Sequence, residues 1–367
     1  MANRKCFEAL DKSLREILIF NNDNNDKKPF GGMTFVLGGD FRQILPIVPK
    51  ERREHIVNAS IKRSYLWNHF EIYELTENMR LSCISNDTKQ QQENKEFAEW
   101  ILNIGDGITT SDEGDEWIQI SSDLMLDTGD EPKETIVKST YPDLFNNYRD
   151  PKFLEERAIQ CPENKTVEEI NEYIMSQIEG EEVTYLSSDS VCKATTSKSI
   201  EHIYPTEFLN SLKFPGIPNH ELRLKVGLPV MLLQNINQSA GLCNGTRMTI
   251  TQLGNKYIKA KIITGTQLGQ KVYIPQINMS PSESKWLFVL KRRQYPLTVC
   301  FAMTINKSQG QSLKTVGLYL SKQVYCHGQL YMALSRVTNR KGLKVLIDDS
   351  ECHGQSKAKN IVYKEIF

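Results

Sequence analysis

The residues with the clearest potential for chemistry directly follow a short apolar run, Met33–Leu37. They are Gly38-Gly39-Asp40-Phe41-Arg42-Gln43. A glutamine in such a place can orient a water toward a phosphoryl group, and an arginine can neutralise the phosphoryl charge. We therefore expect Gly39, Asp40, Arg42 and Gln43 to contact a phosphate. The alternative is a polar turn in which Asp40 and Arg42 pair with each other.

Two further arginines lie at the ends of predicted elements. Arg80 follows the β-type run Glu71–Leu75, and Arg336 ends the helical stretch Gln329–Arg336. An arginine held at such an end can reach a nucleotide phosphate. A surface arginine without a ligand is the plainer interpretation of Arg80.

A segment rich in hydrogen-bond donors, 304–310, follows the apolar run Leu297–Ala302. Its hydroxyl, amide and ammonium groups suit the phosphates and sugars of a nucleic-acid strand, although a helix N-terminus capped by Thr304 is the alternative. The basic run 291–295 ends in an aromatic ring, a pairing typical of single-strand binding, although a charge run also fits a solvated face. The residues expected to bind nucleic acid are Thr304, Asn306, Lys307, Ser308, Gln309, Lys291, Arg292 and Arg293.

The net charge of zero hides a strong division along the chain. Residues 81–215 contain 11 basic and 28 acidic residues, whereas residues 216–367 contain 21 basic and 6 acidic ones, a net charge of +15. Clustered Lys and Arg release counterions when they meet phosphates, so the basic part favours a nucleic-acid partner. Solubility, or pairing with the acidic part, is the other explanation.

Composition excludes several classes of protein. With 39% hydrophobic and 25% charged residues, the chain is typical of globular proteins and is not wholly disordered. No apolar run approaches the ~18–20 residues of a membrane span. The eight cysteines include no Cys-x-x-Cys pair and predict free thiols. Cys326-His327 and Cys352-His353 leave a zinc site as a minor alternative, but their spacing is wrong for one chelating turn, so we expect no metal site.

The elements that must position these residues follow an α/β pattern. Helices are predicted over 5–20, 60–70, 97–104, 166–178 and 329–336, and a capping box at Thr166 begins the fourth of them. Strands are predicted over 33–37, 71–75, 183–186, 297–302, 315–320 and 343–347. A loop is predicted over 81–95. Short β-type runs recur every 10–20 residues from 222 to 295 and predict a small antiparallel barrel.

With these residues in view, the chain resembles the Pif-type DNA helicases. These are RecD-like members of helicase superfamily one, and the Helitron-transposon subgroup is the most similar. The resemblance runs over nearly the whole chain and rests on five blocks: 30–46, 224–233, 242–247, 302–312 and 331–338.

The resemblance implies two RecA-like, P-loop NTPase-type domains with parallel sheets, the first one incomplete, and an inserted barrel similar to a Src-homology-three domain. The implied boundaries are 1–80 for the first domain, 81–221 and 296–367 for the second, and 222–295 for the barrel. Such proteins bind ATP and Mg²⁺ between the domains and move 5′ to 3′ on single-stranded DNA. They act in DNA repair, recombination, telomere maintenance or rolling-circle transposition.

Carried over to this chain, the resemblance gives individual residues a role. Gln43 would sense the γ-phosphate, and Arg80 and Arg336 would reach that phosphate from the second domain. The segment 304–310 would lie along the DNA and link it to the nucleotide. The residues expected at the nucleotide are therefore Gly39, Asp40, Arg42, Gln43, Arg80, Gly310 and Arg336.

The sequence departs from the family in one large respect. It has no P-loop, Gly-x-x-x-x-Gly-Lys-Ser/Thr; the stretch 265–271 has the wrong spacing. It also lacks the Asp-Glu pair that holds Mg²⁺, since Asp348-Asp349 comes after the last family block. We therefore expect a family member without its first ~200 residues, whose residues 1–80 expose a sheet edge and apolar surface and which does not hydrolyse ATP by itself.

Two alternative functions remain open. The basic part would serve as a single-stranded DNA-binding module that needs no ATP, or the chain would dock onto an intact helicase or onto replication and repair proteins. We expect no membrane partner. The expected location is the nucleus, or the mitochondrion if a transit peptide precedes residue 1.

Overall fold

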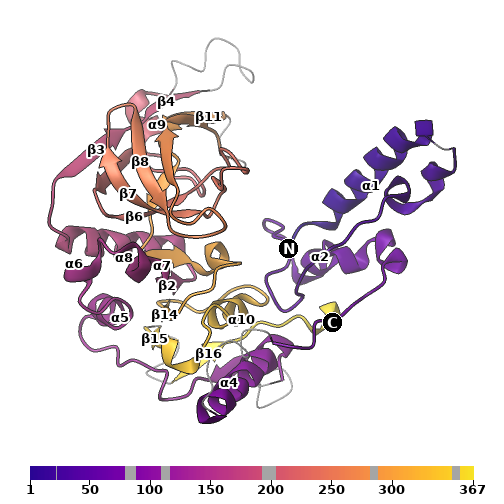
Figure 1. Ribbon diagram of the computed structural model, residues 1–367, viewed down its shortest axis with the longest axis horizontal. Helices are drawn as coiled ribbons and strands as arrows, with labels where there is room; N and C mark the ends of the chain where they lie inside the picture. The colour runs from indigo at the N-terminus through magenta and orange to yellow at the C-terminus, as the bar shows by residue number, and fades with distance from the viewer. Residues whose placement is uncertain (22, 79–87, 109–115, 192–203, 282–287, 349–355) are drawn as a thin grey trace. The chain divides into compact units, whose positions relative to one another are not determined.

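The computed structural model describes residues 1–21, 23–78, 88–108, 116–191, 204–281, 288–348 and 356–367 (Figure 1). The chain divides into two compact units. Unit 1 combines residues 1–125 with 322–340 and 349–367, and unit 2 combines 126–321 with 341–348.

A four-stranded parallel sheet forms one layer of unit 2. Its strand order is β13 (Ala302–Thr304), β2 (Arg157–Cys161), β14 (Thr315–Leu320) and β15 (Leu343–Ile347). Helices α5 (Pro132–Thr140) and α8 (Asn164–Gln177) pack on it. Gly317 of β14 lets α5 approach closely, because a Cβ there would overlap Thr140 and Ile136. The sheet confirms the α/β class predicted from the apolar runs.

Antiparallel strands make up the other layer of unit 2. A five-stranded sheet has the order β12 (Leu297–Val299), β6 (Pro229–Leu232), β7 (Arg247–Leu253), β8 (Tyr257–Ile262) and β9 (Lys271–Pro275). Smaller sheets pair β3 (Glu182–Leu186) with β5 (Glu221–Lys225), and β11 (Leu290–Gln294) with β10 (Ile277–Met279) and β4 (Ser188–Val191). In the described part of the chain, β9 and β12 have no pairing that closes the five strands into a barrel, so closure stays a prediction.

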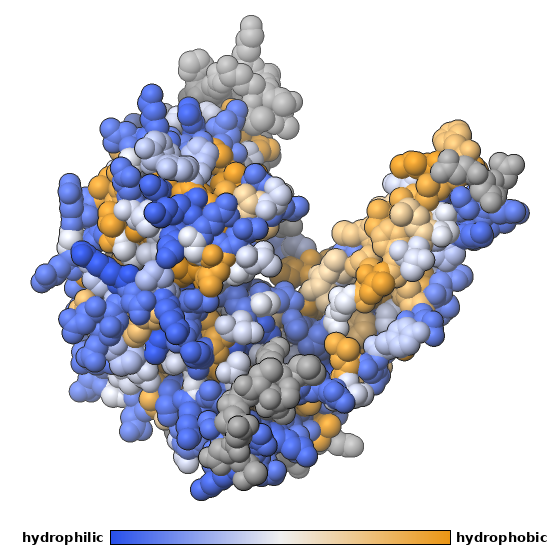
Figure 2. Space-filling model, in the orientation of Figure 1, coloured by the Kyte–Doolittle hydropathy of each residue, from blue (hydrophilic) through white to orange (hydrophobic). Residues whose placement is uncertain are grey.

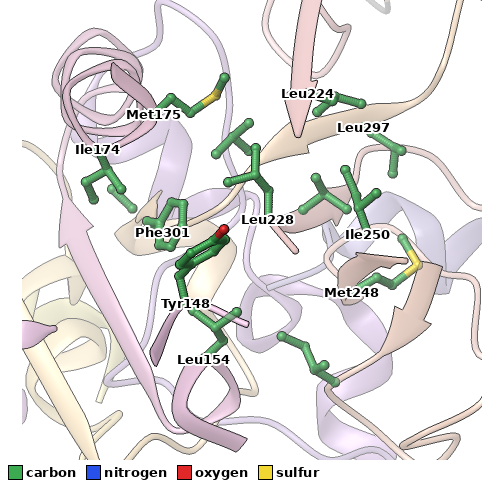
Figure 3. Close-up of a cluster of buried hydrophobic side chains, with 14 of the residues drawn as sticks. Tyr148, Leu154, Ile174, Met175, Leu224, Leu228, Met248, Ile250, Leu297 and Phe301 are labelled. Atoms are coloured by element: carbon green, nitrogen blue, oxygen red, sulfur yellow. The ribbon is translucent and has the colours of Figure 1, made fainter. Parts of the chain in front are cut away.

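One hydrophobic core joins the two layers of unit 2 (Figure 3). Ile174 and Met175 come from α8, Leu228 and Ile250 come from the antiparallel strands and their turns, and Phe301 precedes β13. The short helices α6 (Leu144–Asn147) and α7 (Pro151–Glu155) add Leu144 and Leu154 to the same core, and α9 (Thr206–Ser211) packs on β4.

Unit 1 is mostly helical. It contains α1 (Arg4–Leu18), α2 (Arg53–Asn58), α4 (Thr88–Asp106), α10 (Gln329–Leu334) and short 3-10 helices over 19–21, 23–27, 29–32, 61–63, 65–69 and 364–366. Its β structure among the described residues is one antiparallel pair, β1 (Trp117–Gln119) with β16 (Lys357–Lys359). No helix in these described ranges is long and apolar enough to cross a membrane.

The N-terminal part of unit 1 is held by a buried carboxylate. Asp11 of α1 accepts hydrogen bonds from the Phe30 amide, from the Tyr65 hydroxyl at 2.7 Å and from Arg15 Nε at 3.0 Å. Burial alone raises the pKa of Asp11, but these hydrogen bonds outweigh it and hold the pKa below its ordinary value. Phe30 has φ 53°, so this anchored turn uses an uncommon left-handed backbone.

Two predicted strands are not strands. Met33–Leu37 and Glu71–Leu75 are extended, but their backbones pair with no strand in the described chain. A strand needs a neighbour that supplies backbone partners, and neither segment has one here. Val36 is 92% exposed and Leu75 100% exposed. Apolar side chains accordingly gather on the surface of the N-terminal part, which confirms the predicted apolar exposure (Figure 2).

Three other predictions need correction. Residues 88–95, placed in a loop, form the first turns of α4; residues 81–87 lie outside the described part. Glu163, not Thr166, is the N-cap of α8, because the helix already begins at Asn164; the Thr166 hydroxyl lies 2.8 Å from Ser321 Oγ. The predicted helix over 60–70 is two 3-10 turns separated at Ser64.

Candidate functional site

The predicted phosphate-contacting residues form a tight turn in unit 1, which we call the 40–43 loop (Asp40–Gln43). Asp40 organises it. Its Oδ1 accepts the Arg42 amide at 3.0 Å, its Oδ2 accepts Gln43 Nε2 at 3.1 Å, and its carbonyl accepts the Gln43 amide at 3.1 Å. An aspartate that bonds to its own backbone two residues on is a usual turn former. The carboxylate thus fixes the direction of the Gln43 side chain.

Arg42 leaves this turn and pairs with α4. Its Nε lies 2.6 Å from Asp106 Oδ1 and its Nη2 lies 3.2 Å from Oδ2, a bidentate contact. The hydrogen bonds that the Arg42 guanidinium donates to Asp106 raise the pKa of Arg42. The alternative in which the side chains of Asp40 and Arg42 pair with each other is therefore wrong, because the Arg42 guanidinium pairs with Asp106.

Two glycines let the surrounding elements close on the loop. At Gly105, a Cβ would lie 2.7 Å from Tyr331 Cδ2 and 2.8 Å from Arg42 Cδ. Gly328 has φ 69°, and a Cβ there would overlap the carbonyl of Arg42. The end of α4 and the turn before α10 therefore contact the 40–43 loop at distances that only glycine permits.

Helix α10 and the residues just after it add two groups to the site. The Tyr331 hydroxyl donates to Asp40 Oδ2 at 3.2 Å, and burial together with the Asp40 charge raises the pKa of Tyr331 to about 12. Arg336 is 5% exposed, and its guanidinium donates to the Met332 carbonyl at 2.9 Å and to Ser335 Oγ at 2.8 Å. Its charge also acts on the Tyr331 hydroxyl. The structure thus brings Asp40, Gln43 and Arg336 together in one unit.

The two glycines before the loop do not make its turn. Gly38 and Gly39 do not have positive φ, and a Cβ at either would meet no atom within 4 Å. The chain turns at Phe41-Arg42 instead. The space beside Gly39 is open to a ligand. Arg80 lies outside the described residues.

The segment predicted to follow DNA lies at the carboxyl end of β13 in unit 2. Buried Asn171 of α8 holds the start of that strand, because it donates to the Ala302 carbonyl at 3.0 Å and accepts from the Phe301 and Ala302 amides. A 3-10 turn, Ile305–Ser308, follows, and Gly310 has φ 79° with no atom near its Cβ position. The carboxyl end of a parallel strand is where ligands bind in open α/β sheets.

The side chains of this segment divide into exposed and buried groups. Asn306, Lys307 and Gln309 are half-buried or exposed. Burial lowers the pKa of the Lys307 ammonium. Ser308 is fully buried and donates to the Ile305 carbonyl at 2.7 Å, so its hydroxyl serves the turn and is not directed to solvent. Thr304 is also buried and makes no side-chain cap.

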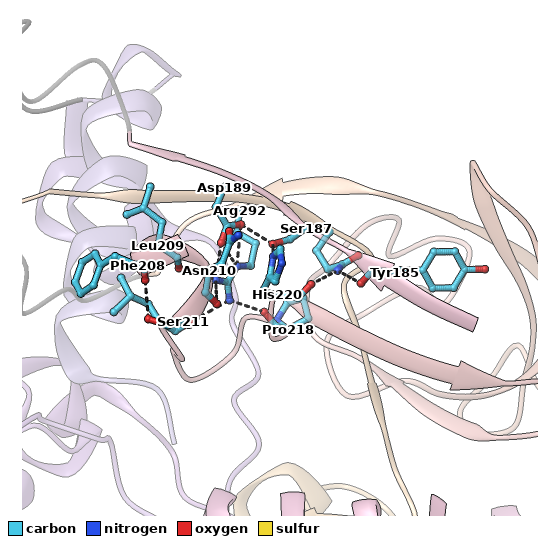
Figure 4. Close-up of polar contacts among 12 residues, drawn as sticks. Tyr185, Ser187, Asp189, Phe208, Leu209, Asn210, Ser211, Pro218, His220 and Arg292 are labelled. Atoms are coloured by element: carbon cyan, nitrogen blue, oxygen red, sulfur yellow. Dashed lines mark hydrogen bonds and ion pairs between the residues drawn. The ribbon is translucent and has the colours of Figure 1, made fainter. Parts of the chain in front are cut away.

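The basic run at β11 requires a correction. Arg292 is fully buried and forms an ion pair with Asp189 of β4, 2.6 Å from Nη2 to Oδ2 (Figure 4). It also donates to the carbonyls of Leu209, Leu212 and Pro218, each at 3.1 Å. Arg292 therefore binds protein atoms and is not available to DNA. Its neighbours Lys291 and Arg293 are on the exposed face of the strand, and their DNA contact remains a prediction.

No group of three His, Cys, Asp or Glu residues in the described ranges is arranged to hold a metal ion. His327 of the zinc alternative uses both ring nitrogens on backbone atoms of Phe41 and Tyr363. Cys352 and His353 lie outside the described residues.

Three residues of the site were not predicted from the sequence: Asp106, His327 and Tyr331. Asp106 lies 64 positions from Arg42, and Tyr331 lies 291 positions from Asp40. No local pattern links positions so distant. Tyr331 does belong to the block 331–338, which was singled out for its arginine.

Two family models match the chain. The model of the PIF1-like helicase matches residues 1–115, and the model of the 2B domain of the DNA helicase Pif1 matches residues 207–253. The first range contains the 40–43 loop and Asp106. The second overlaps the antiparallel sheet through β6 and β7.

Curated relatives extend the match over most of the chain. The ATP-dependent DNA helicase PIF1 of Xenopus laevis is 27% identical over 94% of this chain and 45% of the relative. The ATP-dependent DNA helicase Pif1 of Bdellovibrio bacteriovorus is 25% identical over 92% of this chain and 62% of the relative. The chain thus spans about half the length of the curated relatives it matches.

Solved structures show the same fold. Bacteroides Pif1 bound to single-stranded DNA covers 94% of this chain with a TM-score of 0.61 and 23% identity. Bacteroides Pif1 in complex with ADP-AlF3 and single-stranded DNA covers 94% with a TM-score of 0.58 and 21% identity. The fold of this chain is therefore that of these Pif1 structures. The family models and the curated relatives show that the chain is similar to Pif1-type helicases.

Proposed function

We propose that this chain is the DNA-contacting and phosphate-sensing part of an ATP-dependent 5′–3′ DNA helicase of the Pif1 type. The observation that carries the proposal is the arrangement of unit 1. Gln43, in a loop tied to α4 and α10, shares that unit with Arg336. Glutamine and arginine side chains act on the γ-phosphate in phosphoryl transfer.

The residues present do not by themselves fit Mg²⁺ and ATP. The sequence contains no P-loop. Asp40 is occupied by Gln43 and Tyr331, and Asp106 by Arg42. In phosphoryl transfer, the phosphate-binding loop and the metal ion supply most of the stabilisation of the transition state. Arginine and glutamine side chains only add to it. We therefore infer that the chain hydrolyses ATP only when another polypeptide segment contributes both the phosphate-binding loop and the metal site.

Unit 2 carries the DNA side of the proposal. Lys307, Asn306 and Gln309 follow β13, and Lys291 and Arg293 line the exposed face of β11. Within unit 2, residues 216–321 contain 13 basic and 2 acidic residues, a net charge of +11, which supports a polyanion partner. A location in the nucleus or the mitochondrion belongs to this proposal, as do the domain boundaries 1–80, 81–221 with 296–367, and 222–295.

The test pairs two assays on the purified 367-residue chain. ATP turnover is measured with single-stranded DNA, first alone and then with the P-loop-containing N-terminal half of a Pif1-type relative added. DNA binding is measured over a salt series. We expect no turnover by the chain alone, a gain on adding the second half that Gln43→Ala removes, and binding that weakens steeply with salt. No gain with any relative's half, together with salt-insensitive binding, would reject the proposal.

A second candidate function is single-stranded DNA binding without ATP. The parallel sheet of unit 2 has its own core and its own covering helices, which favours this function. The exposed apolar runs 33–37 and 71–75 favour a further variant, in which the chain docks onto an intact helicase or a replication or repair protein. DNA binding with no gain of turnover in the paired assay would favour the ATP-independent DNA-binding function. Capture of a purified intact helicase by this chain without DNA would favour the docking function.

A further inference from the structure

A buried histidine links three separate parts of unit 1. His327 stands in the turn before α10 and is 1% exposed. Its Nε2 lies 2.7 Å from the carbonyl oxygen of Phe41 in the 40–43 loop. Its Nδ1 accepts the backbone N–H of Tyr363 at 2.8 Å.

These two contacts determine the protonation state of the ring. A carbonyl oxygen can only accept, so Nε2 must carry a hydrogen. A backbone N–H can only donate, so Nδ1 must carry a lone pair. The neutral imidazole with its hydrogen on Nε2 satisfies both partners. In the imidazolium, the hydrogen on Nδ1 would face the Tyr363 N–H. In the other neutral tautomer, the same clash occurs and the lone pair of Nε2 would also face the Phe41 carbonyl oxygen.

The groups around the ring keep it in that state. Tyr363 and Phe367 pack on it, with ring centroids at 5.2 and 6.2 Å. Charges face it from three elements: Asp40 from the loop, Arg53 from α2 and Glu365 from the C-terminal 3-10 helix. Burial lowers the pKa of His327 and Arg53 adds to this, whereas the Phe41 carbonyl, Asp40 and Glu365 oppose it.

We propose that neutral His327 is a positioning residue that fixes the 40–43 loop, and with it the Gln43 side chain, to α10 and to the C-terminal segment 356–367. This inference rests on the proposed function only for the role of Gln43. Gly328 reinforces the link, because its amide donates to the Ile361 carbonyl at 3.0 Å while its missing Cβ admits the Arg42 carbonyl.

The proposal has a consequence for pH. When the ring gains a proton, Nδ1 becomes a donor that faces the Tyr363 N–H, and the C-terminal segment loses its contact with the turn. The charge also comes to lie in a site without solvent. We therefore expect both the loop and the segment to loosen as the pH falls below the ordinary pKa of histidine, about 6.5.

The first test reads the tautomer directly in the full-length chain. Selective ¹⁵N labelling of histidine distinguishes a protonated ring nitrogen from a lone-pair nitrogen by chemical shift. For His327 we expect a protonated Nε2 and an unprotonated Nδ1 at pH 7.5. A proton on Nδ1, or rapid averaging of the two nitrogens, would overturn the proposal. This measurement needs neither ATP nor DNA, so it stands if the proposed function fails.

The second test separates the two bonds with two variants. In His327→Gln the amide nitrogen reaches the Nε2 position and keeps the bond to Phe41, whereas in His327→Asn the amide oxygen reaches the Nδ1 position and keeps the bond to Tyr363. In the glutamine variant only, amide hydrogen exchange at Tyr363 should quicken about five- to tenfold, as the loss of one hydrogen bond implies. In the asparagine variant only, amide hydrogen exchange at Gln43 should quicken by a similar factor.

Exposed His69 in the same unit gives the control, since His69→Gln should change neither exchange rate. Equal protection of both amides in all three variants would contradict the positioning role. If a turnover assay with an added P-loop half succeeds, both His327 variants should lower kcat with little change in the KM for DNA. If that assay fails and DNA binding does not depend on salt, while the tautomer and exchange results hold, the proposed function is wrong and the positioning role remains.

Discussion

Arg292 and Arg293 are adjacent in sequence, yet the structure assigns them opposite consequences. The side chains of Arg292 and Asp189 are both fully buried, and the guanidinium donates to that carboxylate and to four backbone carbonyls (Figure 4). Arg292→Ala removes all of these donors and leaves an uncompensated buried charge. Breaking a buried pair in this way costs about 3–5 kcal/mol. We expect the free energy of unfolding of unit 2 to fall by that amount.

The assay is urea unfolding followed by circular dichroism, with Arg293→Ala as the matched control. Because Arg293 is exposed, its replacement should change the free energy of unfolding by less than about 0.5 kcal/mol. If Arg293 contacts a phosphate, the same variant should lower the slope of log affinity against log salt by about 0.7 on single-stranded DNA. An Arg292→Ala protein with unchanged stability and weakened DNA binding would refute this reasoning.

Three further predictions follow from the contacts of single residues. The pKa of Asp11 is lower in the folded chain than its value of about 3.9 in the unfolded chain. The ionised carboxylate therefore stabilises unit 1 at pH values above about 3.9, and this contribution is lost as the pH falls further. Asp11→Asn should accordingly reduce the dependence of the free energy of unfolding on pH in the acid range. Gly328→Ala should destabilise unit 1 by about 1–3 kcal/mol in thermal unfolding, because φ is positive and the methyl group meets the Arg42 carbonyl; an unchanged melting temperature would show that the loop is not held there. Lys307→Met should weaken DNA binding nearly equally for all DNA sequences, and the slope of log affinity against log salt should fall by the amount expected for the loss of about one phosphate contact. A slope equal to that of the unaltered chain would show that Lys307 does not contact DNA.

Much of the parallel sheet could be predicted from the sequence because its strands are continuous apolar runs. The runs 315–320 and 343–347 are buried on both faces, and each forms a strand as predicted. Met33–Leu37 has the same character but no neighbour in the described chain, and it remains extended and exposed. The local pattern indicates what a segment can form, whereas the partner that completes it is a property of the whole fold.

The candidate site was predictable only in part, for a similar reason. Asp40, Arg42 and Gln43 are contiguous, so a motif could single them out. Asp106 and His327 join them through contacts across many residues, which no local spacing indicates. Arg292 is different, because its burial was readable: in a strand, side chains alternate between faces, so residues 291 and 293 point one way and residue 292 points the other.

The most direct test of the account is the turnover of ATP by the purified 367-residue chain in the presence of single-stranded DNA. The account predicts no turnover above background and DNA binding that weakens steeply as salt rises. Turnover by the chain alone that Gln43→Ala or Arg336→Ala abolishes would contradict it. That result would mean that residues within this sequence form a phosphate cradle without a P-loop.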